Sequence, residues 1–333
     1  MSHEVEKMAY VGETPWHGLG SLLSKGATID EWTIEAGMNW FIKEASVNFD
    51  AVNSEFETVS VPFEKQKVLY RSDTLAPLSV VSDRYNVVQP IEIMEFYRDL
   101  TQNSDFELES AGVLKEGKKL WALAKTGQSM TLKGGDNTES YILLATACDG
   151  TMATTAQFTS IRVVCANTLS WAINAKKKDD HGVIKVPHST VFNAETVKEA
   201  LGIRTKAWDD YAYAMKKLTE RRVKDAEVER FITHLYKDID ARLPMRISKK
   251  TGQATVPNAR AKKRIAELYN GHGHGANLES AKGTAYGLLN AVTEFIDHER
   301  GTHNNDNRQD SAWFGTGLEI KERALLSAYD LIA

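Results

Sequence analysis

Apolar and polar residues alternate in the middle of the chain in a pattern typical of paired strands. In FELESAGVL (106–114), apolar residues alternate with glutamates, as they do in a strand with one buried face. KLWALAK, which follows the turn KEGKK, is expected to be the hairpin partner of this strand. ESYILLATAC and TMATTAQF then flank Asp149-Gly150, a dipeptide favoured in two-residue turns. The pattern therefore predicts four consecutive antiparallel strands.

Apolar residues recur at helical spacing on both sides of these strands. QPIEIMEFYRDL (89–100) places Pro90 in a first turn and repeats apolar residues every three or four positions. Directly after the last strand, FTSIRVVCANTLSWAINAKKKDD (158–180) predicts a helix from about residue 162 to residue 174. The order helix, four strands, helix predicts an α+β fold, with an antiparallel sheet and helices packed on one face.

The flanking regions follow other patterns. Short strands are expected at residues 47–49, 57–62, 67–70 and 78–82, after a short helix capped by Thr28 or Asp30. From residue 195 onward apolar residues keep helical spacing, so this part is expected to be mainly helical. We therefore predict an α+β domain at residues 1–193 and a helical region at residues 194–333, with a mobile basic loop at residues 245–264.

The composition is that of a globular protein. Hydrophobic residues make up 42% of the 333 residues and charged residues 26%. No apolar run approaches the roughly 20 residues that cross a bilayer, and the start MSHEVEKMAY has no apolar signal-peptide core. Cys148 and Cys165 are the two cysteines, which implies no disulfide framework. A cytoplasmic protein without membrane contact is expected.

The net charge of −4 hides an asymmetry along the chain. Residues 1–60 carry ten acidic and three basic side chains, whereas residues 201–264 carry eight acidic and seventeen basic ones. A mildly acidic protein can bind a polyanion if its cations gather on one face. The alternative is a solvated helical surface of mixed charge.

Motifs of known enzymes are missing from the sequence. Cys165 lies in an apolar run without a Cys–His spacing of a catalytic type, so a buried, unreactive side chain is expected. The GHGHG stretch, with His272 and His274, and the later His298 do not have the spacing of a zinc site. Glycine-rich phosphate loops and a serine elbow do not occur either. The sequence therefore predicts a protein that is not an enzyme and has no cofactor.

The cations indicate a binding function. Arg162 would begin the helix expected after the last strand, where free backbone N–H groups can bind phosphate. Trp171, Trp208, Tyr211 and Tyr213 are interleaved with cations, a combination typical of single-strand binding, although Trp208 and Tyr211 are also the best core candidates of their helix. The candidate nucleic-acid contacts are Arg162, Lys176, Lys177, Lys178, Arg204, Lys206, Arg221, Arg222, Lys249 and Lys250.

Four motifs carry a resemblance to a known family. They are TPWHGLG (14–20), SDRYNVVQP (82–90), FTSIRVVCANTL (158–169), and TAYGLLNAVTEFIDH followed by SAWFGTGLEIKERAL. In this order they resemble the phage/plasmid-like protein family, described by a large domain of unknown function (domain of unknown function 932). The resemblance covers nearly the whole chain and implies a gene carried by bacteriophages, prophages or plasmids, without an assigned catalytic residue.

The architecture expected for residues 89–174 is also similar to the β-β-β-α core of single-strand annealing recombinases. These proteins form rings or filaments and hold a strand in a basic groove. The similarity implies a protein of the bacterial cytoplasm that binds single-stranded DNA and anneals it without ATP, as a homo-oligomer. A host or phage replication or recombination protein is a further candidate partner.

Two alternatives remain at this stage. One is a non-enzymatic phage or plasmid accessory protein that binds a host defence protein. The other is a metal-dependent nuclease that uses Asp297, His298 and the GHGHG loop.

Overall fold

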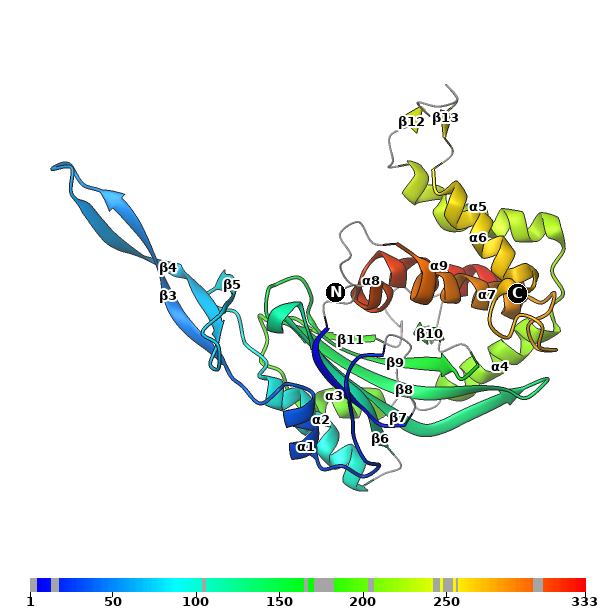
Figure 1. The fold of residues 1–333 in the computed structure, drawn as a ribbon, viewed down its shortest axis with the longest axis horizontal. Coiled ribbons are helices and arrows are strands. Elements are labelled where there is room, and N and C mark those ends of the chain that lie inside the picture. The colour runs from blue at the N-terminus through cyan, green and yellow to red at the C-terminus, as the bar shows by residue number, and fades with distance from the viewer. Residues whose placement is uncertain are drawn as a thin grey trace.

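The computed structural model describes residues 5–12, 18–103, 106–164, 167–170, 183–202, 207–241, 246–247, 254–255, 257–301 and 308–333. Within these ranges it is a mixed α+β structure with a curled antiparallel sheet and a mostly helical C-terminal region, so the predicted fold class is confirmed (Figure 1). None of the helices in the described ranges is long and apolar enough to cross a membrane.

The main sheet has eight strands among the described residues. In spatial order they are β10 (Asn167–Ser170), β9 (Thr154–Arg162), β8 (Asp136–Ala147), β7 (Lys119–Leu132), β6 (Glu107–Leu114), β1 (Val5–Tyr10) and β2 (Ser21–Leu22), with β11 (Val183–Val186) also paired to β9. The predicted hairpins β6–β7 and β8–β9 are confirmed. The predicted two-residue turn at Asp149-Gly150 is wrong, because β8 ends at residue 147 and β9 begins at residue 154.

Helices pack against both faces of this sheet. On one face lies α2 (Pro90–Asn103), whose Tyr97 hydroxyl donates a hydrogen bond of 2.9 Å to the carbonyl of Ala122. On the other face, Trp121 of β7 meets Trp313 of α8 (Arg308–Phe314) edge to face, with ring centroids 5.2 Å apart. The prediction of helices on one face is therefore wrong. The second layer comes from the C-terminal helices, which local patterns could not place.

The remaining helices follow the predicted amphipathic pattern except for α7 (Ala285–Glu294), which is buried on all sides. They are α1 (Ile29–Glu35), α3 (Ala194–Gly202), α4 (Ala207–Glu220), α5 (Asp225–Ala241), α6 (Ala259–Glu267), α7 and α9 (Thr316–Asp330), with π-helical turns at Leu268–His272 and Phe295–Glu299. Thr28 caps α1 and forms a capping box with Glu31. Trp208, Tyr211 and Phe231 are buried, as their helical spacing indicates.

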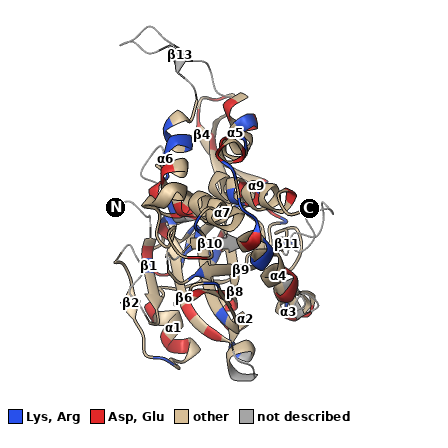
Figure 2. Cartoon of the chain, turned by 90° about the vertical axis from the view of Figure 1, so that its right-hand side faces the viewer, with Lys and Arg blue, Asp and Glu red and all other residues tan. Residues whose placement is uncertain are grey.

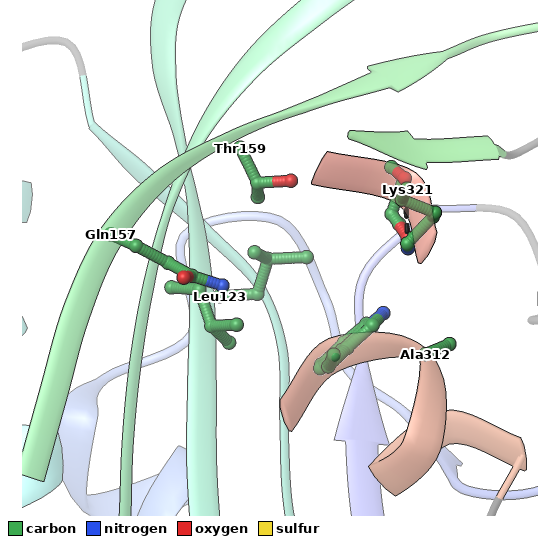
Figure 3. Close-up of a pocket in the computed structure, with 8 residues that line it drawn as sticks. Leu123, Gln157, Thr159, Ala312 and Lys321 are labelled. Carbon is green, nitrogen blue, oxygen red and sulfur yellow. Dashed lines mark hydrogen bonds between the residues drawn. The ribbon is translucent and has the colours of Figure 1, made fainter. Parts of the chain in front are cut away.

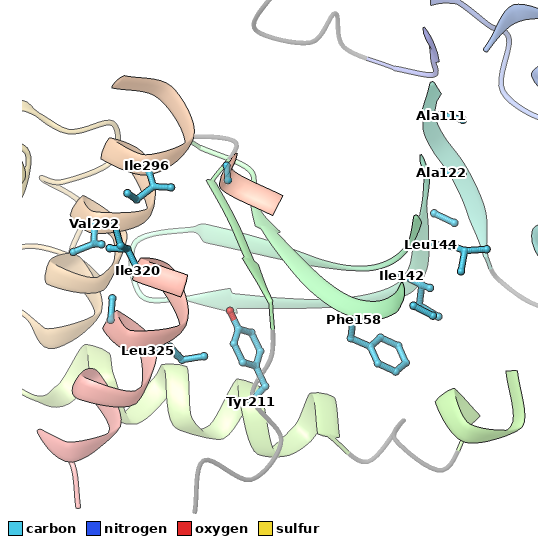
Figure 4. Packing of buried hydrophobic residues seen from close by; sticks show 14 of the residues in the cluster. Ala111, Ala122, Ile142, Leu144, Phe158, Tyr211, Val292, Ile296, Ile320 and Leu325 are labelled. Carbon is cyan, nitrogen blue, oxygen red and sulfur yellow. The ribbon is translucent and has the colours of Figure 1, made fainter. Parts of the chain in front are cut away.

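One hydrophobic cluster joins the sheet to the C-terminal helices (Figure 4). It includes Ile142 and Phe158 of the sheet, Tyr211 of α4, Val292 of α7 and Leu325 of α9. Residues on both sides of the domain boundary predicted at residue 193 thus share buried contacts. The helical region is consequently held against the sheet.

The helix predicted for residues 162–174 is wrong. β9 ends at Arg162, and Asn167–Ser170 form β10, which pairs antiparallel with β9 through Asn167 opposite Arg162. The β-branched residues of this stretch suit a pleated strand, and β9 offers a free edge for pairing. Residues 165–166 and 171–182, which include Cys165 and Trp171, lie outside the described residues.

The mobile basic loop predicted at residues 245–264 is also partly structured. β12 (Arg246–Ile247) pairs with β13 (Ala254–Thr255), and α6 begins at Ala259. The positively charged side chains at the end of this segment therefore lie on a helix.

A second sheet, of three strands, projects from the body. It contains β3 (Ile42–Val52), β4 (Thr58–Arg71) and β5 (Pro77–Ser82), and it unites the four short strands that the sequence predicts here (Figure 1). β3 and β4 form a long hairpin that extends well beyond β5, and we call this hairpin the β3–β4 arm.

Candidate nucleic-acid surface

Arg162 is buried in an ion pair. It is the last residue of β9, its guanidinium side chain is 3% exposed, and Asp136 of β8 accepts hydrogen bonds from Nε at 2.8 Å and from Nη2 at 2.6 Å. Arg162 ends a strand and does not begin a helix, so the reason for expecting phosphate binding at this position is removed. A phosphate could reach this guanidinium only if the pair with Asp136 opened.

The same ion pair fixes the GHGHG loop against the sheet. Arg162 donates to the carbonyl of His274 at 3.3 Å and to that of Gly275 at 3.1 Å, and its guanidinium lies 5.4 Å from the ring centre of Tyr286. Ser280 donates to Asp136 from the same loop region. The guanidinium and carboxylate are thus satisfied within the protein, as buried charges require.

A second buried ion pair joins β10 to the C-terminal helices. Lys321 of α9 lies 2.8 Å from Asp297, and it donates to the carbonyl and hydroxyl oxygens of Thr168 at 2.9 Å. Asp297 in turn accepts from the backbone N–H of Thr168 at 2.7 Å. These contacts hold the last strand of the sheet against the helices.

A small pocket lies beside this pair, between the sheet and the C-terminal helices. Figure 3 shows Leu123, Gln157 and Thr159 of the sheet on one side, and Ala312 and Lys321 of the helices on the other. The ammonium of Lys321 is already paired with Asp297. The pocket therefore offers a substrate no free charge from this lysine.

The histidines of the GHGHG loop have partners other than a metal. His274 Nδ1 lies 2.8 Å from Glu294, and His272 Nδ1 lies 3.0 Å from the carbonyl of Glu267. Asp297 is held by Lys321. Across the described ranges, no group of three or more His, Cys, Asp or Glu side chains could hold a metal ion.

The two predicted arginines at the α4–α5 junction differ in their surroundings. Arg221 is partly buried, because it donates to the carbonyl of Leu331 at 3.0 Å and pairs with Glu227 at 2.6 Å. Arg222 is exposed and donates to the carbonyl of Lys282. Arg222 is therefore the one of these two that faces solvent. The other predicted contacts, Lys176, Lys177, Lys178, Arg204, Lys206, Lys249 and Lys250, lie outside the described residues.

Exposed cations gather around Arg222 from four segments of the chain. We call this set the basic surface; its members are Lys133 of the β7–β8 turn, Lys216 and Lys217 of α4, Arg222 and Lys224 of the α4–α5 junction, and Lys282 before α7. Figure 2 shows Lys and Arg positions along the chain between α4 and α5. Contacts at the backbone level hold the segments together, since Arg222 bridges to Thr284 and Val223 donates to the carbonyl of Gly283.

Three of these cations, Lys217, Lys133 and Lys216, act on the carboxylate of Glu220. A hydrogen bond from Lys217 is the main cause that lowers the pKa of Glu220, and the nearby charges of Lys133 and Lys216 lower it further. Lys133 comes from the sheet, whereas the other lysines come from α4. Glu220 also neutralises part of the positive charge of this surface.

An exposed aromatic side chain lies on the same helix. Tyr213 is 64% exposed, and Lys217 Nζ lies 5.7 Å from the centre of its ring. Trp208 and Tyr211 are 5% exposed, so they serve the core. Of the four aromatic residues that the sequence singles out, Tyr213 is the one that the described structure leaves available for stacking. Sequence reasoning missed Lys133 and Lys282, whose only local signal is a lysine beside glycine in KGGDN and AKGT.

A family model described as Domain of unknown function (DUF932) matches residues 77–313. The chain belongs to this family. The resemblance to the domain of unknown function 932 is thereby confirmed. Neither a curated protein nor a solved structure matches the chain.

The DUF932 match covers the main sheet from β6 onward and most of the helices. All six members of the basic surface lie within it. The β3–β4 arm, by contrast, precedes the matched residues.

Proposed function

We propose that this member of the DUF932 family binds single-stranded DNA on the basic surface and promotes the annealing of complementary strands without nucleotide hydrolysis. The observation that supports the proposal is the convergence of exposed cations from four chain segments beside the exposed Tyr213. Cations that follow a sugar–phosphate backbone, together with an aromatic face for bases, are typical of sequence-independent strand binding.

A surface that binds a strand and screens its phosphate charges can be sufficient for annealing. Pairing of complementary strands is favourable once the repulsion between their phosphates is screened, and lysines that displace counterions provide that screening. Lys216, Lys282 and Lys133 would contact the backbone of the strand, and Tyr213 would stack on a base. The gene context of phages and plasmids stays part of the proposal.

Arg162 is not among the proposed DNA contacts, because it forms a buried ion pair with Asp136. The predicted cations outside the described residues remain candidates to extend the surface. A strand longer than this surface would run on to a second subunit, so a ring or filament of copies stays part of the proposal.

The proposal is tested by fluorescence anisotropy with a labelled oligonucleotide over a series of salt concentrations. The triple variant Lys133→Ala, Lys216→Ala and Lys282→Ala should weaken binding by roughly tenfold or more and reduce the salt slope by about two to three. Lys25→Ala is the matched control, because Lys25 is an exposed lysine that pairs with Glu107 at the far end of the sheet. It should change neither quantity.

The annealing step is tested separately with complementary oligonucleotides that carry a fluorophore and a quencher, in the absence of ATP. The wild-type protein should accelerate pairing, and the triple variant should not. If the triple variant and Lys25→Ala have the same affinity for DNA and the same salt slope, the basic surface is not the DNA-binding site. Wild-type protein that is indifferent to DNA would favour the accessory protein that binds a host defence protein.

A further inference from the structure

The outer part of the β3–β4 arm is a two-stranded ribbon without support from the body. β5 pairs with β4 only at residues 66–70, so the paired segments 48–52 and 58–62 have no third strand. An isolated two-stranded hairpin is marginally stable in water. Among the residues that the structure describes, no layer therefore covers this ribbon.

One face of the ribbon is apolar. The register places Phe49 opposite Val61 and Ala51 opposite Val59, and residues opposite each other in an antiparallel pair lie on the same face. Phe63 continues the same alternation along β4. Phe49, Val59 and Phe63 are 48%, 38% and 42% exposed, which leaves a row of large apolar side chains facing solvent.

The other face is mainly polar. Asn48 is opposite Pro62, Asp50 is opposite Ser60, and Val52 is opposite Thr58. The ribbon is therefore amphipathic, like a strand pair of a sandwich whose second sheet is missing.

Charge is distributed unevenly along the arm. Its outer part carries Asp50, Glu55 and Glu57, and no lysine or arginine occurs from residue 44 to residue 64. Its base carries Lys43, which lies opposite Tyr70, together with a further lysine that pairs with Glu44. The tip of the arm is thus negatively charged, and its base carries positively charged lysines.

We propose that this arm pairs with the arm of a second copy of the chain, apolar face against apolar face, with the two arms running in opposite directions. A twofold axis brings the same patch of both copies together, so the patch has to be self-complementary. The antiparallel direction places the acidic tip of each arm beside the lysines at the base of the other. A parallel direction would place the two acidic tips together.

The tip of the arm supports this direction. Phe56 in the turn is 91% exposed and has a φ of 64°, a conformation that is costly for a bulky residue. In the antiparallel arrangement Phe56 reaches the base of the partner's arm. There Phe41 and Leu75 are 57% and 71% exposed, and they offer an apolar surface on which its ring can pack.

This inference is independent of the proposed DNA binding, because it concerns different residues and is tested without DNA. Sedimentation equilibrium of the full chain measures it. The wild-type protein should be in a concentration-dependent equilibrium that includes a dimer. Val59→Ser, on the apolar face, should raise the dimer dissociation constant by on the order of tenfold, because the change occurs twice in the interface.

Val52→Ser is the matched control, since it is the same substitution in the same arm on the opposite face, at a side chain that is 67% exposed. It should leave the dissociation constant within about twofold, as surface changes do. Circular dichroism should show that both variants stay folded. A monomeric wild-type protein, or equal effects of the two variants, would overturn the proposal.

A charge exchange tests the direction of the arms. Glu57→Lys and Lys43→Glu should each weaken the dimer, because each places like charges together across the interface. The double variant restores opposite charges and should recover most of the wild-type dissociation constant. A double variant weaker than either single variant would overturn the antiparallel arrangement.

Discussion

Arg162, at the end of β9, and Asp136, at the start of β8, form an ion pair in which both side chains are 3% exposed or less. The pair lies where the sheet meets the loop that precedes α7, since the guanidinium also donates to the carbonyls of His274 and Gly275. It therefore fastens the helical region to the sheet.

Asp136→Asn should destabilise the protein by about 3–5 kcal/mol, because it leaves the Arg162 charge buried without a counterion. Urea denaturation measures this change in the free energy of unfolding. Glu44→Gln is the control, since the pair of Glu44 with Lys67 is half exposed at Glu44 and should contribute about 1 kcal/mol or less. Similar losses for the two variants would contradict the structural role of Arg162.

Glu299 should make stability depend on pH in the acidic range. Hydrogen bonds from Arg264, at 2.6 and 2.7 Å, hold the pKa of Glu299 below its usual value of 4.5. A lowered pKa in the folded state contributes stability above the unfolded pKa, and this contribution is lost as pH falls through the folded pKa. Wild type should exceed Glu299→Gln in stability at pH 7, and the difference should shrink below pH 4.5. Denaturant unfolding at a series of pH values measures it, and a difference that is constant with pH would contradict the prediction.

Cys148 should be unreactive in the folded protein. Its thiol is buried, and burial raises its pKa to about 12, so almost no thiolate exists at neutral pH. In a Cys165→Ser background, a thiol reagent at pH 8 should modify Cys148 only after denaturant unfolds the chain. Rapid modification of the native protein would show that the end of β8 opens to solvent.

Gly287→Ala should destabilise the protein by about 3 kcal/mol. A Cβ at this position in α7 would overlap the carbonyl oxygen of Ala281, and this overpacking outweighs the better helix propensity of alanine. Gly301→Ala is the control, because nothing lies within 4 Å of the added carbon. It should change stability by no more than about 0.5 kcal/mol. Thermal unfolding of the two variants makes the comparison.

Local patterns predicted the elements with strong periodicity. The alternation around β6 and β7, the spacing of α2, and the amphipathic faces that bury Tyr211 and Phe231 are all visible in short windows of sequence. The secondary structure of the segment after β9 could not be predicted in this way, because a short apolar run has no periodicity that distinguishes a helix from a strand. Residues 167–170 form a strand because they pair with β9.

The basic surface could be predicted only in part. Arg222 stands in a cation-rich stretch, whereas Lys133 and Lys282 join it from distant parts of the chain. No local pattern distinguishes the exposed Arg222 from the buried Arg162, because both are arginines next to β-branched residues. Arg162 is buried because Asp136 lies beside it in the folded protein and forms an ion pair with it.

The sequence by itself determined the α+β class, the hairpins of the main sheet and the helical C-terminal region, because hydrophobic periodicity is a local property that a strand or helix satisfies within a few residues. The tertiary structure decided that helices cover both faces of the sheet, that Arg162 is buried, and that the β3–β4 arm leaves an apolar face uncovered. These features depend on contacts between segments that are far apart in the sequence. The free energy of such contacts cannot be inferred from any short stretch of the sequence.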